Sequence, residues 1–584
     1  MSDLRVVIVG GVASGASAAA RLRRLSEEVQ ITIFEKTSFA SFANCGLPYY
    51  IGGEVRQWKD LQVSSPEELS ARYNVDVRLN TEVISIDREN KRVFVKDLIS
   101  EDITRKEYDH LILATGSRAV VPDNIPGITR TGHFTLRTME DTGAIEQYIS
   151  ATHPKRIVVC GGGFIGVEVA EQLKKRSLQV TIVEKENQLL TALDPEMAEY
   201  IHQSLEKKGV KLVVADGVKS FEEPKSNAMA SDVILNSGTR LPADLVILAL
   251  GVTPCTELAK AAGIDLNSEG YIRVNDRMRS FSCPWIWAVG DSIEVRNPTL
   301  GVHERWAVAL GGPASKQGRV CAENIIGKAR AAVYRGTFGA AGIRVWTTTA
   351  ACVGLNEKFL KNKGLKYTSV YVHANQHPGW YPGSTQVHLK LIFDSVTGKI
   401  YGAQAAGEDG IEKRIDVIST AMMAGTTARD LSDLELCYAP PFGSARDPVN
   451  HAGMMAGNVM GGLLETVSPS DLILMVKSGE FSNQNYILLD VRGEAAGAKQ
   501  PISVVPKDRV VYVEVDSLRP KVTNDPELAE RLRSSKVIVS CQSGLRAHVG
   551  SRMLLGMGFT NIKVLTGSFL TYTMVDKASA RGAL

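Results

Sequence analysis

Short hydrophobic runs that end in glycine-rich turns dominate the first half of the chain. Residues 4–9 form an apolar run, followed by the glycine-rich residues 10–15 and a helical stretch at 16–25. The same order recurs over residues 156–176. Continuous apolar runs of this length are typical of parallel strands that are buried on both faces. The pattern therefore predicts two strand–turn–helix units in an α/β protein, either two similar domains or an internal duplication.

Further strands are expected between and after these units. Residues 75–79, 83–86 and 92–95 predict a meander of short strands within 54–107. Two later apolar runs, at 111–113 and 245–250, end in small residues. Small residues at a strand end let the backbone pass close to a bound molecule.

The second half of the chain has a different pattern. Residues 333–450 combine strands and helices, for example a strand at 389–393, and residues 451–469 are a Gly/Met-rich stretch that predicts a linker. Strands at 486–489 and 537–540 then indicate a separate domain over 470–575.

The first glycine-rich turn is close to the G-x-G-x-x-G pattern, with Val12 at the place of the middle glycine. Glycines there let backbone N–H groups approach a pyrophosphate at a helix N-terminus. Glu35 ends the next strand, where a carboxylate can accept ribose hydroxyls. The candidate contacts for this dinucleotide are Gly10, Gly11, Val12, Ala13, Ser14, Gly15, Glu35 and Lys36.

The second turn is a full fingerprint in the expected strand–turn–helix setting, with Gly161, Gly163, Ile165 and Gly166 as candidate contacts. Glu184 ends the following strand and favours a free 2′-hydroxyl, which indicates NADH. Further cofactor contacts are expected where later strands end. Asp291 could hydrogen-bond the ribityl chain of a flavin, and the other candidates are Thr115, Gly116 and Gly251.

Two cysteines are candidates for chemistry. Cys45 lies between a run of small and polar residues and the Gly-x-Pro sequence at 46–48. As a thiolate, it could exchange electrons there with a bound flavin. Cys541 follows a strand and precedes a helix, and the helix N-terminus and Arg546 would stabilise its thiolate. Backbone N–H groups of that loop could also hold an outer persulfide sulfur. For each cysteine the alternative is a buried structural residue.

Composition narrows the function classes. The 584 residues suggest roughly four domains. A net charge of +3 gives no reason to expect nucleic acid or an anionic membrane as a partner. The eight cysteines are dispersed, with neither a CxxC pair nor a metal-ligand spacing, which suits a reducing cytoplasm. The longest uncharged stretch, at 452–464, is too short to span a bilayer.

The two turns, Glu35, residues 114–116 and residues 288–291 together resemble the flavoprotein disulfide reductases, over about residues 1–450. Many members carry a C-x₄-C pair after the acidic residue. With its single Cys45, the chain instead resembles the branch that comprises coenzyme A disulfide reductases, NADH peroxidases and NADH oxidases. Peroxidases have a histidine where this chain has Ala13, which counts against peroxide chemistry. Within the branch the sequence is most similar to the coenzyme A disulfide reductases.

This resemblance implies FAD, NADH, a homodimer, and coenzyme A as a bound substrate or adduct. Its implied coenzyme A contacts are Ser17, Arg21, Arg24, Ser41 and Asn44. Arginines on one helix face can pair with a polyphosphate, although a solvated face is the alternative. Family members direct two tyrosines from the partner subunit toward the cysteine. Tyr438 matches one of them, and Trp380 replaces the other, with Tyr381 beside it.

The last domain resembles a rhodanese, whose active loop begins with the nucleophilic cysteine, although residues 497–505 match poorly. The expected fold class is α/β, with two Rossmann-like dinucleotide-binding domains, an α+β dimerisation domain and a C-terminal α/β rhodanese domain. The expected boundaries are 1–150 and 276–332 for FAD, 151–275 for NADH, 333–450 for dimerisation, 451–469 for the linker and 470–584 for the rhodanese.

The implied activity is NADH-dependent reduction of sulfur–sulfur bonds with release of sulfide. The acceptors would be coenzyme A persulfide, other low-molecular-weight persulfides or polysulfide. Electrons would pass from NADH through FAD to Cys45, Tyr438 would protonate the leaving thiolate, and Cys541 would carry sulfane sulfur. The alternatives are a coenzyme A disulfide reductase, an NADH oxidase, or a sulfurtransferase with a vestigial redox module.

Overall fold

The computed structural model describes residues 4–225, 227–301, 304–327 and 332–583. These fall into two compact units. Unit 1 comprises Met1–Val183 and Asp216–Gly339, and unit 2 comprises Glu184–Ala215 and Ala340–Leu584.

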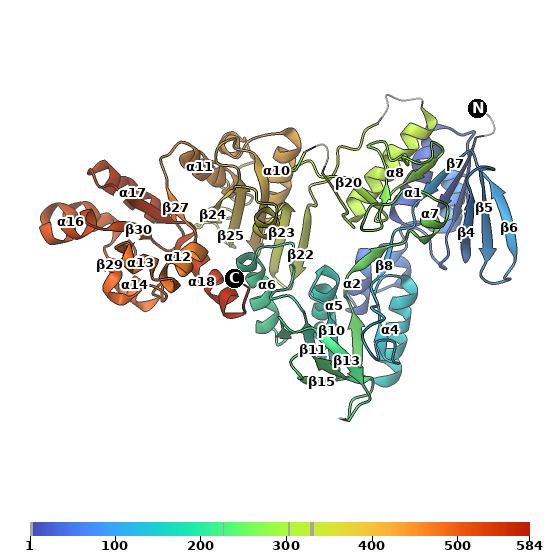
Figure 1. Ribbon diagram of the computed structural model, residues 1–584, viewed down its shortest axis with the longest axis horizontal. Coiled ribbons are helices and arrows are strands. Elements are labelled where there is room, and N and C mark those ends of the chain that lie inside the picture. Colours follow the sequence, from blue (N-terminus) through green and yellow to red (C-terminus); the bar gives the residue numbers. More distant parts are fainter. Residues whose placement is uncertain (1–3, 226, 302–303, 328–331, 584) are drawn as a thin grey trace. The chain divides into compact units, whose positions relative to one another are not determined.

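Unit 1 contains a parallel five-stranded sheet (Figure 1). Buried hydrophobic residues pack on both of its faces. In spatial order its strands are β19 (Ile286–Ala288), β7 (His110–Leu113), β1 (Arg5–Val9), β2 (Gln30–Phe34) and β3 (Val75–Arg78). Helices α1 (Ala13–Leu25) and α8 (Gly311–Ile326) pack side by side. Strand β19 shows that the chain returns to the first sheet after the second glycine-rich turn, as predicted.

The meander is shorter than predicted. Its strands are β4 (Thr81–Asp87), β5 (Arg92–Asp97) and β6 (Ile103–Glu107). Residues 75–78 instead form the edge strand β3 of the parallel sheet, where Val75 pairs with Ile31 and is buried. Period-2 alternation does not distinguish an edge strand of one sheet from the first strand of another.

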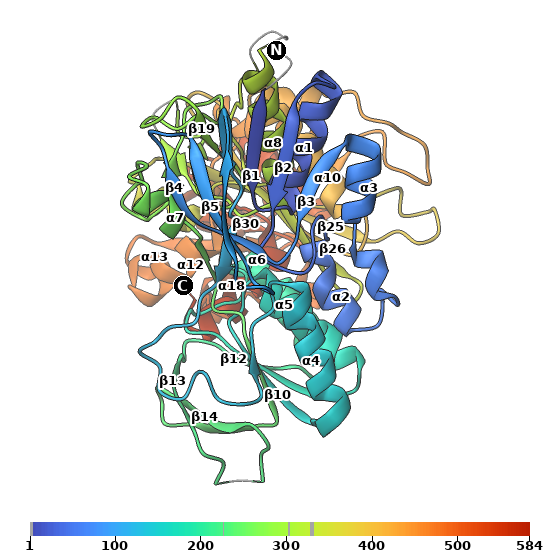
Figure 2. The ribbon, with the colours of Figure 1, turned by 90° about the vertical axis from the view of Figure 1, so that its right-hand side faces the viewer.

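A second parallel sheet in unit 1 carries the second glycine-rich turn. Its strands in this unit are β11 (Gln179–Val183), β10 (Arg156–Cys160), β16 (Leu245–Leu248) and β9 (His133–Phe134). Helix α5 (Phe164–Lys175) follows the turn and packs on this sheet (Figure 2). Because β9 belongs to it, this sheet begins before the expected boundary at residue 151.

Shorter elements complete unit 1. Its other helices are α2 (Leu47–Ile51), α3 (Pro66–Tyr73), α4 (Met139–Thr152) and α7 (Glu257–Ala261). Its other strands are β8 (Ser117–Ala119), β13 (Val218–Glu222), β14 (Ser231–Leu235), β15 (Arg240–Ala243), β17 (Val252–Pro254), β18 (Ile272–Arg273), β20 (Ile293–Arg296) and β21 (Arg305–Trp306).

Unit 2 contains an antiparallel sheet covered by helices. The sheet order is β22 (Ala341–Val345), β23 (Thr348–Gly354), β26 (Ile400–Gly407), β25 (Gln386–Phe393) and β24 (Thr368–Asn375). Residues 400–407 are buried along their whole length, as expected for the central strand of a covered sheet. The helices of this region are α6 (Pro195–Lys207), α9 (Glu357–Asn362), α10 (Ile411–Ala424) and α11 (Pro448–Met460), and β12 (Lys211–Val213) follows α6.

The C-terminal region of unit 2 is a parallel α/β domain. Its sheet order is β27 (Thr466–Val467), β31 (Ile562–Leu565), β30 (Lys536–Ser540), β28 (Tyr486–Asp490) and β29 (Val510–Tyr512). Its helices are α12 (Pro469–Lys477), α13 (Glu480–Asn483), α14 (Glu494–Lys499), α15 (Leu518–Asn524), α16 (Pro526–Arg533), α17 (Leu545–Gly556) and α18 (Ser568–Ala580).

The predicted linker is mostly helical, which corrects the expectation that residues 451–469 connect two domains without regular structure. Residues 451–460 belong to α11, whose N-terminus is capped by Asp447. Only the residues from 461 to 465 lie between this helix and β27. The Gly/Met-rich composition was misleading because small residues also allow a helix to pack closely, as Gly453 does against Leu431 and Ser432.

Helix α18 also anchors the C-terminal domain to helix α6. The Arg581 guanidinium donates to Glu199 at 3.0 and 3.3 Å and to Glu206 at 3.0 and 2.8 Å. Glu199 is fully buried and also accepts from His202 at 3.0 Å. Lys577 adds a hydrogen bond to Gln203. We call Arg581, Glu199, Glu206 and His202 the C-terminal clamp.

We expect Arg581→Ala to weaken the clamp, because it leaves the buried Glu199 without its guanidinium partner. The loss should be about 1–3 kcal/mol, below that of a fully buried pair because Arg581 is partly exposed. Limited proteolysis should then cleave faster at residues 461–465. Arg531→Ala, which removes an exposed arginine bonded to a carbonyl, is the control. Equal cleavage rates in both variants would contradict the anchoring role.

Candidate active site

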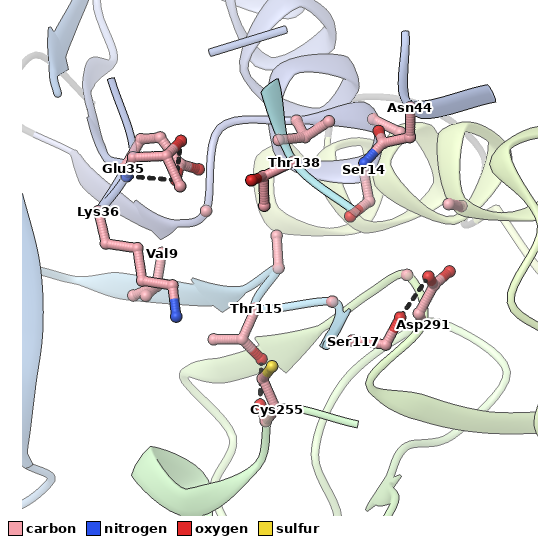
Figure 3. A pocket seen from close by; sticks show the side chains of 18 of the residues that line it. Val9, Ser14, Glu35, Lys36, Asn44, Thr115, Ser117, Thr138, Cys255 and Asp291 are labelled. Carbon is pink, nitrogen blue, oxygen red and sulfur yellow. Dashed lines mark hydrogen bonds between the residues drawn. The ribbon is translucent and has the colours of Figure 1, made fainter. Parts of the chain in front are cut away.

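A cavity of about 800 Å³ in unit 1 brings most of the predicted cofactor residues together (Figure 3). Those that line it are Gly10, Val12, Ala13, Ser14, Glu35, Lys36, Thr115, Gly116 and Asp291. Cys45 and Asn44 lie in the same wall. Gly11 and Gly15 do not line the cavity; they shape the turn behind it.

The first turn leaves room for a phosphate at the start of helix α1. Gly10 has φ +101°, and a Cβ there would lie 2.3 Å from the Ala114 carbonyl oxygen. A Cβ on Gly15 would lie 1.9 Å from the Gly10 carbonyl oxygen. The first turn of α1 contains no acidic residue. Because helix N-termini attract anions, this turn fits the pyrophosphate of FAD, and the cavity is large enough for a dinucleotide.

Glu35 organises the rim of this cavity. Its Oε2 accepts the Gly11 N–H at 2.8 Å, and its Oε1 accepts the Thr37 N–H and hydroxyl at 2.9 Å each. The side chain is buried and lines the cavity. The carboxylate therefore holds the turn as well as facing the space predicted for a ribose, since each oxygen can accept more than one hydrogen bond.

Asp291 is tied to an arginine that the sequence did not reveal. Its Oδ2 accepts from Arg137 at 2.6 Å. The same oxygen accepts from the Ser117 hydroxyl at 2.9 Å (Figure 3). The Arg137 carbonyl oxygen in turn accepts from Asn44 at 3.3 Å. Arg137 thus connects the cysteine loop with Asp291. No motif surrounds it, so only the fold could identify it.

Cys45 lies in a short 3-10 turn, Asn44–Gly46, and its side chain is exposed. The loop before it is held by the Ser41 N–H, which donates to the Gly11 carbonyl at 2.8 Å. Val63 donates back to the Ser41 carbonyl at 2.7 Å. These bonds keep the cysteine loop beside the first glycine-rich turn, although Ser41 has the unfavourable φ of +50°.

The protonated form of Cys45 is favoured in this structure. Although the residue as a whole is exposed, the protein atoms around the thiol partly desolvate it, and this desolvation raises the pKa of Cys45. Glu168 and Asp291 act in the same direction, while Arg137 lowers the pKa. The expected thiolate therefore needs an additional stabilising influence. Cys255 was not expected at the site, yet it also lines the cavity, and its carbonyl accepts from the Thr115 hydroxyl at 2.6 Å.

The second turn repeats the geometry of the first. Gly161 has φ +110°, and a Cβ there would lie 2.1 Å from the Ala249 carbonyl oxygen. A Cβ on Gly166 would lie 2.1 Å from the Gly161 carbonyl oxygen. Gly163 is the N-cap of α5, Ile165 lies in its first turn, and Gly251 has φ +102°. Glu184 directly follows β11 in the chain, and its Oε1 accepts the Glu186 N–H at 2.9 Å.

The predicted coenzyme A contacts on α1 differ in their environment. The Ser17 hydroxyl is 3.0 Å from that of Ser315, and Arg21 donates to Glu323 of α8 at 2.5 and 3.0 Å. Arg24 is exposed. Arg23 is instead buried and donates to several backbone carbonyls, so its role is structural.

The predicted tyrosine and tryptophan of the dimer site lie on the surface of unit 2. Tyr438 is 55% exposed and Trp380 is 73% exposed. Tyr381 is half-buried and packs edge-on against His377, with ring centroids 5.4 Å apart. Large exposed aromatic side chains are typical of surfaces that a partner covers.

Cys541 lies at the end of β30 and is only 1% exposed. Its Sγ accepts the Gly544 N–H at 3.1 Å, and its own N–H donates to the Ser568 hydroxyl at 3.1 Å. Arg492, a buried residue paired with Asp490, donates to the Gln542 side chain at 3.3 Å. The loop thus presents one backbone N–H, that of Gly544, to the Cys541 sulfur. Arg546 is exposed on α17.

Comparisons with known proteins agree with this architecture. Residues 4–318 match the model of the family described as pyridine nucleotide-disulphide oxidoreductase, and residues 342–448 match its dimerisation domain. The coenzyme A disulfide reductase of Staphylococcus haemolyticus is 32% identical over 452 residues, 77% of this chain and 99% of that protein.

Two solved structures match nearly the full length of the chain. Reduced CoADR-RHD of Bacillus anthracis has a TM-score of 0.91 and 41% identity, with 98% of each chain covered. The NAD-dependent persulfide reductase of A. fulgidus has a TM-score of 0.86 and 33% identity, covering 97% of this chain and 100% of that one.

These matches confirm the predicted nucleotide-binding and dimerisation domains and the use of FAD and NAD(H). No family model among these matches covers the C-terminal domain. In the part of the chain that the structure describes, no helix is long and apolar enough to cross a membrane. The chain is an enzyme and belongs to the pyridine nucleotide-disulphide oxidoreductase family.

Proposed function

We propose that this enzyme uses NADH to reduce the sulfur–sulfur bond of coenzyme A persulfide, other low-molecular-weight persulfides or polysulfide, and releases sulfide. The observation that carries the proposal is the exposed Cys45 in the wall of the cavity that fits FAD. The relatives named coenzyme A disulfide reductase and NAD-dependent persulfide reductase support sulfur–sulfur bonds as the acceptor class.

The C-terminal domain favours a sulfane sulfur acceptor over a simple disulfide. The coenzyme A disulfide reductase of S. haemolyticus matches only 77% of the chain, whereas the A. fulgidus persulfide reductase matches 97%. The extra length contains Cys541, whose sulfur accepts the Gly544 N–H. We therefore assign this domain as a rhodanese that carries or delivers sulfane sulfur.

The residues of this chain have separate roles in the proposed reaction. The first turn, Glu35 and Asp291 would hold FAD, which would supply two-electron transfer chemistry when bound. Cys45 attacks the acceptor and forms the mixed disulfide or persulfide, with Ser41 and Asn44 beside it. Arg21 and Arg24 of α1 bind the coenzyme A phosphates, and Ser17 lies on the same helix.

A homodimer would complete this site. Tyr438 of each subunit would protonate the thiolate that leaves at the partner's cysteine, and Trp380 and Tyr381 would line the acceptor path. The matched dimerisation domain and the exposed Tyr438 support this arrangement. The eight unpaired cysteines support a reducing, cytoplasmic location.

Coenzyme A disulfide reduction is the second candidate, favoured by the relatives of that name. Steady-state NADH consumption under argon with coenzyme A persulfide, coenzyme A disulfide and polysulfide separates the two candidates. Faster turnover with the disulfide than with either sulfane acceptor would contradict our proposal. Consumption that requires oxygen would indicate an oxidase, and sulfur transfer without NADH consumption would indicate a sulfurtransferase.

Glu184→Arg should weaken the preference for NADH over NADPH by about tenfold or more. A carboxylate at this strand end suits a free 2′-hydroxyl and repels a 2′-phosphate, whereas an arginine attracts it. The ratio of kcat/KM for the two nucleotides, measured with one acceptor, tests this. Lys185→Arg, which keeps the neighbouring charge, is the control. If the wild type used NADPH equally well, the role assigned to Glu184 would be wrong.

A further inference from the structure

The segment that follows β11 is held by the C-terminal end of the chain. Residues 184–194, which begin with Glu184 and end where α6 starts, belong to unit 2 together with α6 and α18. Helix α18 packs beside α6 (Figure 1). We call residues 184–190 the nucleotide loop, because Glu184 is the residue expected to accept the ribose hydroxyls of NADH. Two contacts join this loop to the end of α18.

The first contact runs through buried side chains of α6. The Leu189 N–H donates to the His202 Nε2 at 3.0 Å, and the His202 Nδ1 lies 3.0 Å from the Glu199 Oε2. Arg581, the C-cap of α18, donates to Glu199 at 3.0 and 3.3 Å. Leu189, His202 and Glu199 are buried. A continuous chain of hydrogen bonds thus connects Arg581 with the backbone of the nucleotide loop.

This chain assigns the proton positions on His202. A ring nitrogen that accepts a backbone N–H carries no proton of its own, so the Nε2 is unprotonated. The proton of the neutral ring is therefore on Nδ1, which donates to the Glu199 carboxylate. Burial raises the pKa of Glu199, but the hydrogen bonds from His202 and Arg581 bring it below its ordinary value. The ionised Glu199 keeps the His202 Nε2 available to the Leu189 N–H.

The second contact is direct. The Asn187 Nδ2 donates to the carbonyl of Gly582, the residue after Arg581. Asn187 is exposed, whereas the chain through His202 is buried, so the loop is held on two sides by the same end of α18.

The nucleotide loop in turn orients Glu184. The Glu184 Oε1 accepts the Glu186 N–H at 2.9 Å, and Glu186 is the neighbour of Asn187. A shift of the loop backbone would therefore move the hydrogen bond that aims this carboxylate. A binding group that is already in place avoids the entropy cost of ordering the loop when the ligand binds.

We propose that Arg581 and Gly582 of the C-terminal domain are positioning residues of the NADH site, which hold the nucleotide loop so that Glu184 is in place before the nucleotide binds. The C-terminal domain then contributes to nucleotide binding in addition to its proposed part in sulfur transfer. This inference rests on the proposed function in taking Glu184 as the contact to the adenosine ribose of NADH. The effect is on nucleotide affinity and not on turnover at saturation.

Binding of ADP-ribose to the FAD-loaded enzyme tests the inference without turnover. ADP-ribose carries the adenosine ribose and the pyrophosphate of NADH but lacks the nicotinamide, and isothermal titration calorimetry measures its Kd. Asn187→Ala removes the direct contact at an exposed position. We expect its Kd to rise by about three- to tenfold, the range that the loss of one hydrogen bond produces.

His202→Asn is a second, independent variant that interrupts the buried chain. The asparagine amide can donate to Glu199 from the place of the Nδ1, but it offers no acceptor to the Leu189 N–H. Because a buried N–H is then left unpaired, the Kd for ADP-ribose should rise by about tenfold. Hydrogen exchange measured by mass spectrometry should also become faster in the peptide that contains residues 184–190.

Lys577→Ala is the matched control. Lys577 lies on the same helix α18 and donates to Gln203 of the same helix α6 at 3.0 Å, yet this bond does not reach the nucleotide loop. Its Kd for ADP-ribose and its exchange in residues 184–190 should equal those of the wild type.

Two reduced nucleotides separate positioning from a general loss of structure. NADH contains the adenosine ribose, whereas reduced nicotinamide mononucleotide lacks it. In Asn187→Ala and His202→Asn the KM for NADH should rise while kcat is unchanged, because the lost interaction is made equally in the ground state and the transition state. The kcat/KM for the mononucleotide should stay at the wild-type value.

Three outcomes would overturn the inference. They are wild-type Kd values for ADP-ribose in both variants, an equal rise in Lys577→Ala, and an equal fall in kcat/KM for NADH and for the mononucleotide. A wild type that binds no ADP-ribose would overturn the role of Glu184 as well. A failure of the proposed reductase function would instead appear as retained acceptor reduction in Cys45→Ser, which leaves the ADP-ribose affinities unaffected.

Discussion

Cys45→Ser is expected to keep its bound FAD and to lose NADH-dependent reduction of persulfides and disulfides by about 10³-fold or more. A serine hydroxyl is a poor nucleophile at neutral pH and forms no disulfide, so the exchange step has no substitute. The cavity residues that fit FAD are unchanged, and serine is close to cysteine in size. NADH consumption under argon and the flavin absorbance spectrum measure the two effects.

Mass spectrometry of untreated enzyme adds a direct test of the same residue. Cys45 should carry a small-thiol adduct, because no C-x₄-C partner precedes it, and the thiol that we expect is coenzyme A. Cys255→Ser is the matched control, since Cys255 is the other cysteine that lines the cavity. A Cys45–Cys255 disulfide in place of the adduct would contradict the single-cysteine mechanism. Full activity of Cys45→Ser would contradict the proposed function.

Cys541→Ala is expected to abolish sulfur transfer to cyanide or to a thiol and to spare reduction of coenzyme A disulfide. The Cys541 sulfur accepts the Gly544 N–H. The N-terminus of the helix that follows would stabilise the Cys541 thiolate by about 0.3–2 kcal/mol. Bulky or protein-bound persulfides depend on this domain for delivery, so their turnover should fall. Coenzyme A disulfide can reach the exposed Cys45 directly.

The comparison uses one variant, two acceptors and the same NADH assay. Cys352→Ala, which changes a buried cysteine of β23, controls for the loss of a thiol. Equal loss with both acceptors would mean that Cys541 supports folding or the redox step. Equal retention with both, alongside lost transfer to cyanide, would mean that the two domains work independently.

The sequence by itself determined the nucleotide-binding units and indicated the two candidate cysteine loops. Gly10 and Gly161 could be identified because a tight strand–turn–helix connection leaves no room for a Cβ, so local geometry dictates the residue. Cys45 and Cys541 were found for a similar reason, since each lies in a short loop whose flanking pattern is local. The strand expected at 75–79 is present, but its expected place in the meander was wrong, because short alternation fits either sheet. The expected linker was wrong because small residues also fit a closely packed helix.

Only the tertiary structure revealed which charged side chains lie beside one another. Arg137 is far from Cys45 and Asp291 in the chain, yet it is bonded to the loop of one and the side chain of the other. Glu168 meets Tyr49 only because α2 packs on α5. The C-terminal clamp likewise joins Arg581 to Glu199 across the fold of unit 2. Such charges leave no local pattern, because their energy depends on burial and on neighbours that folding brings together.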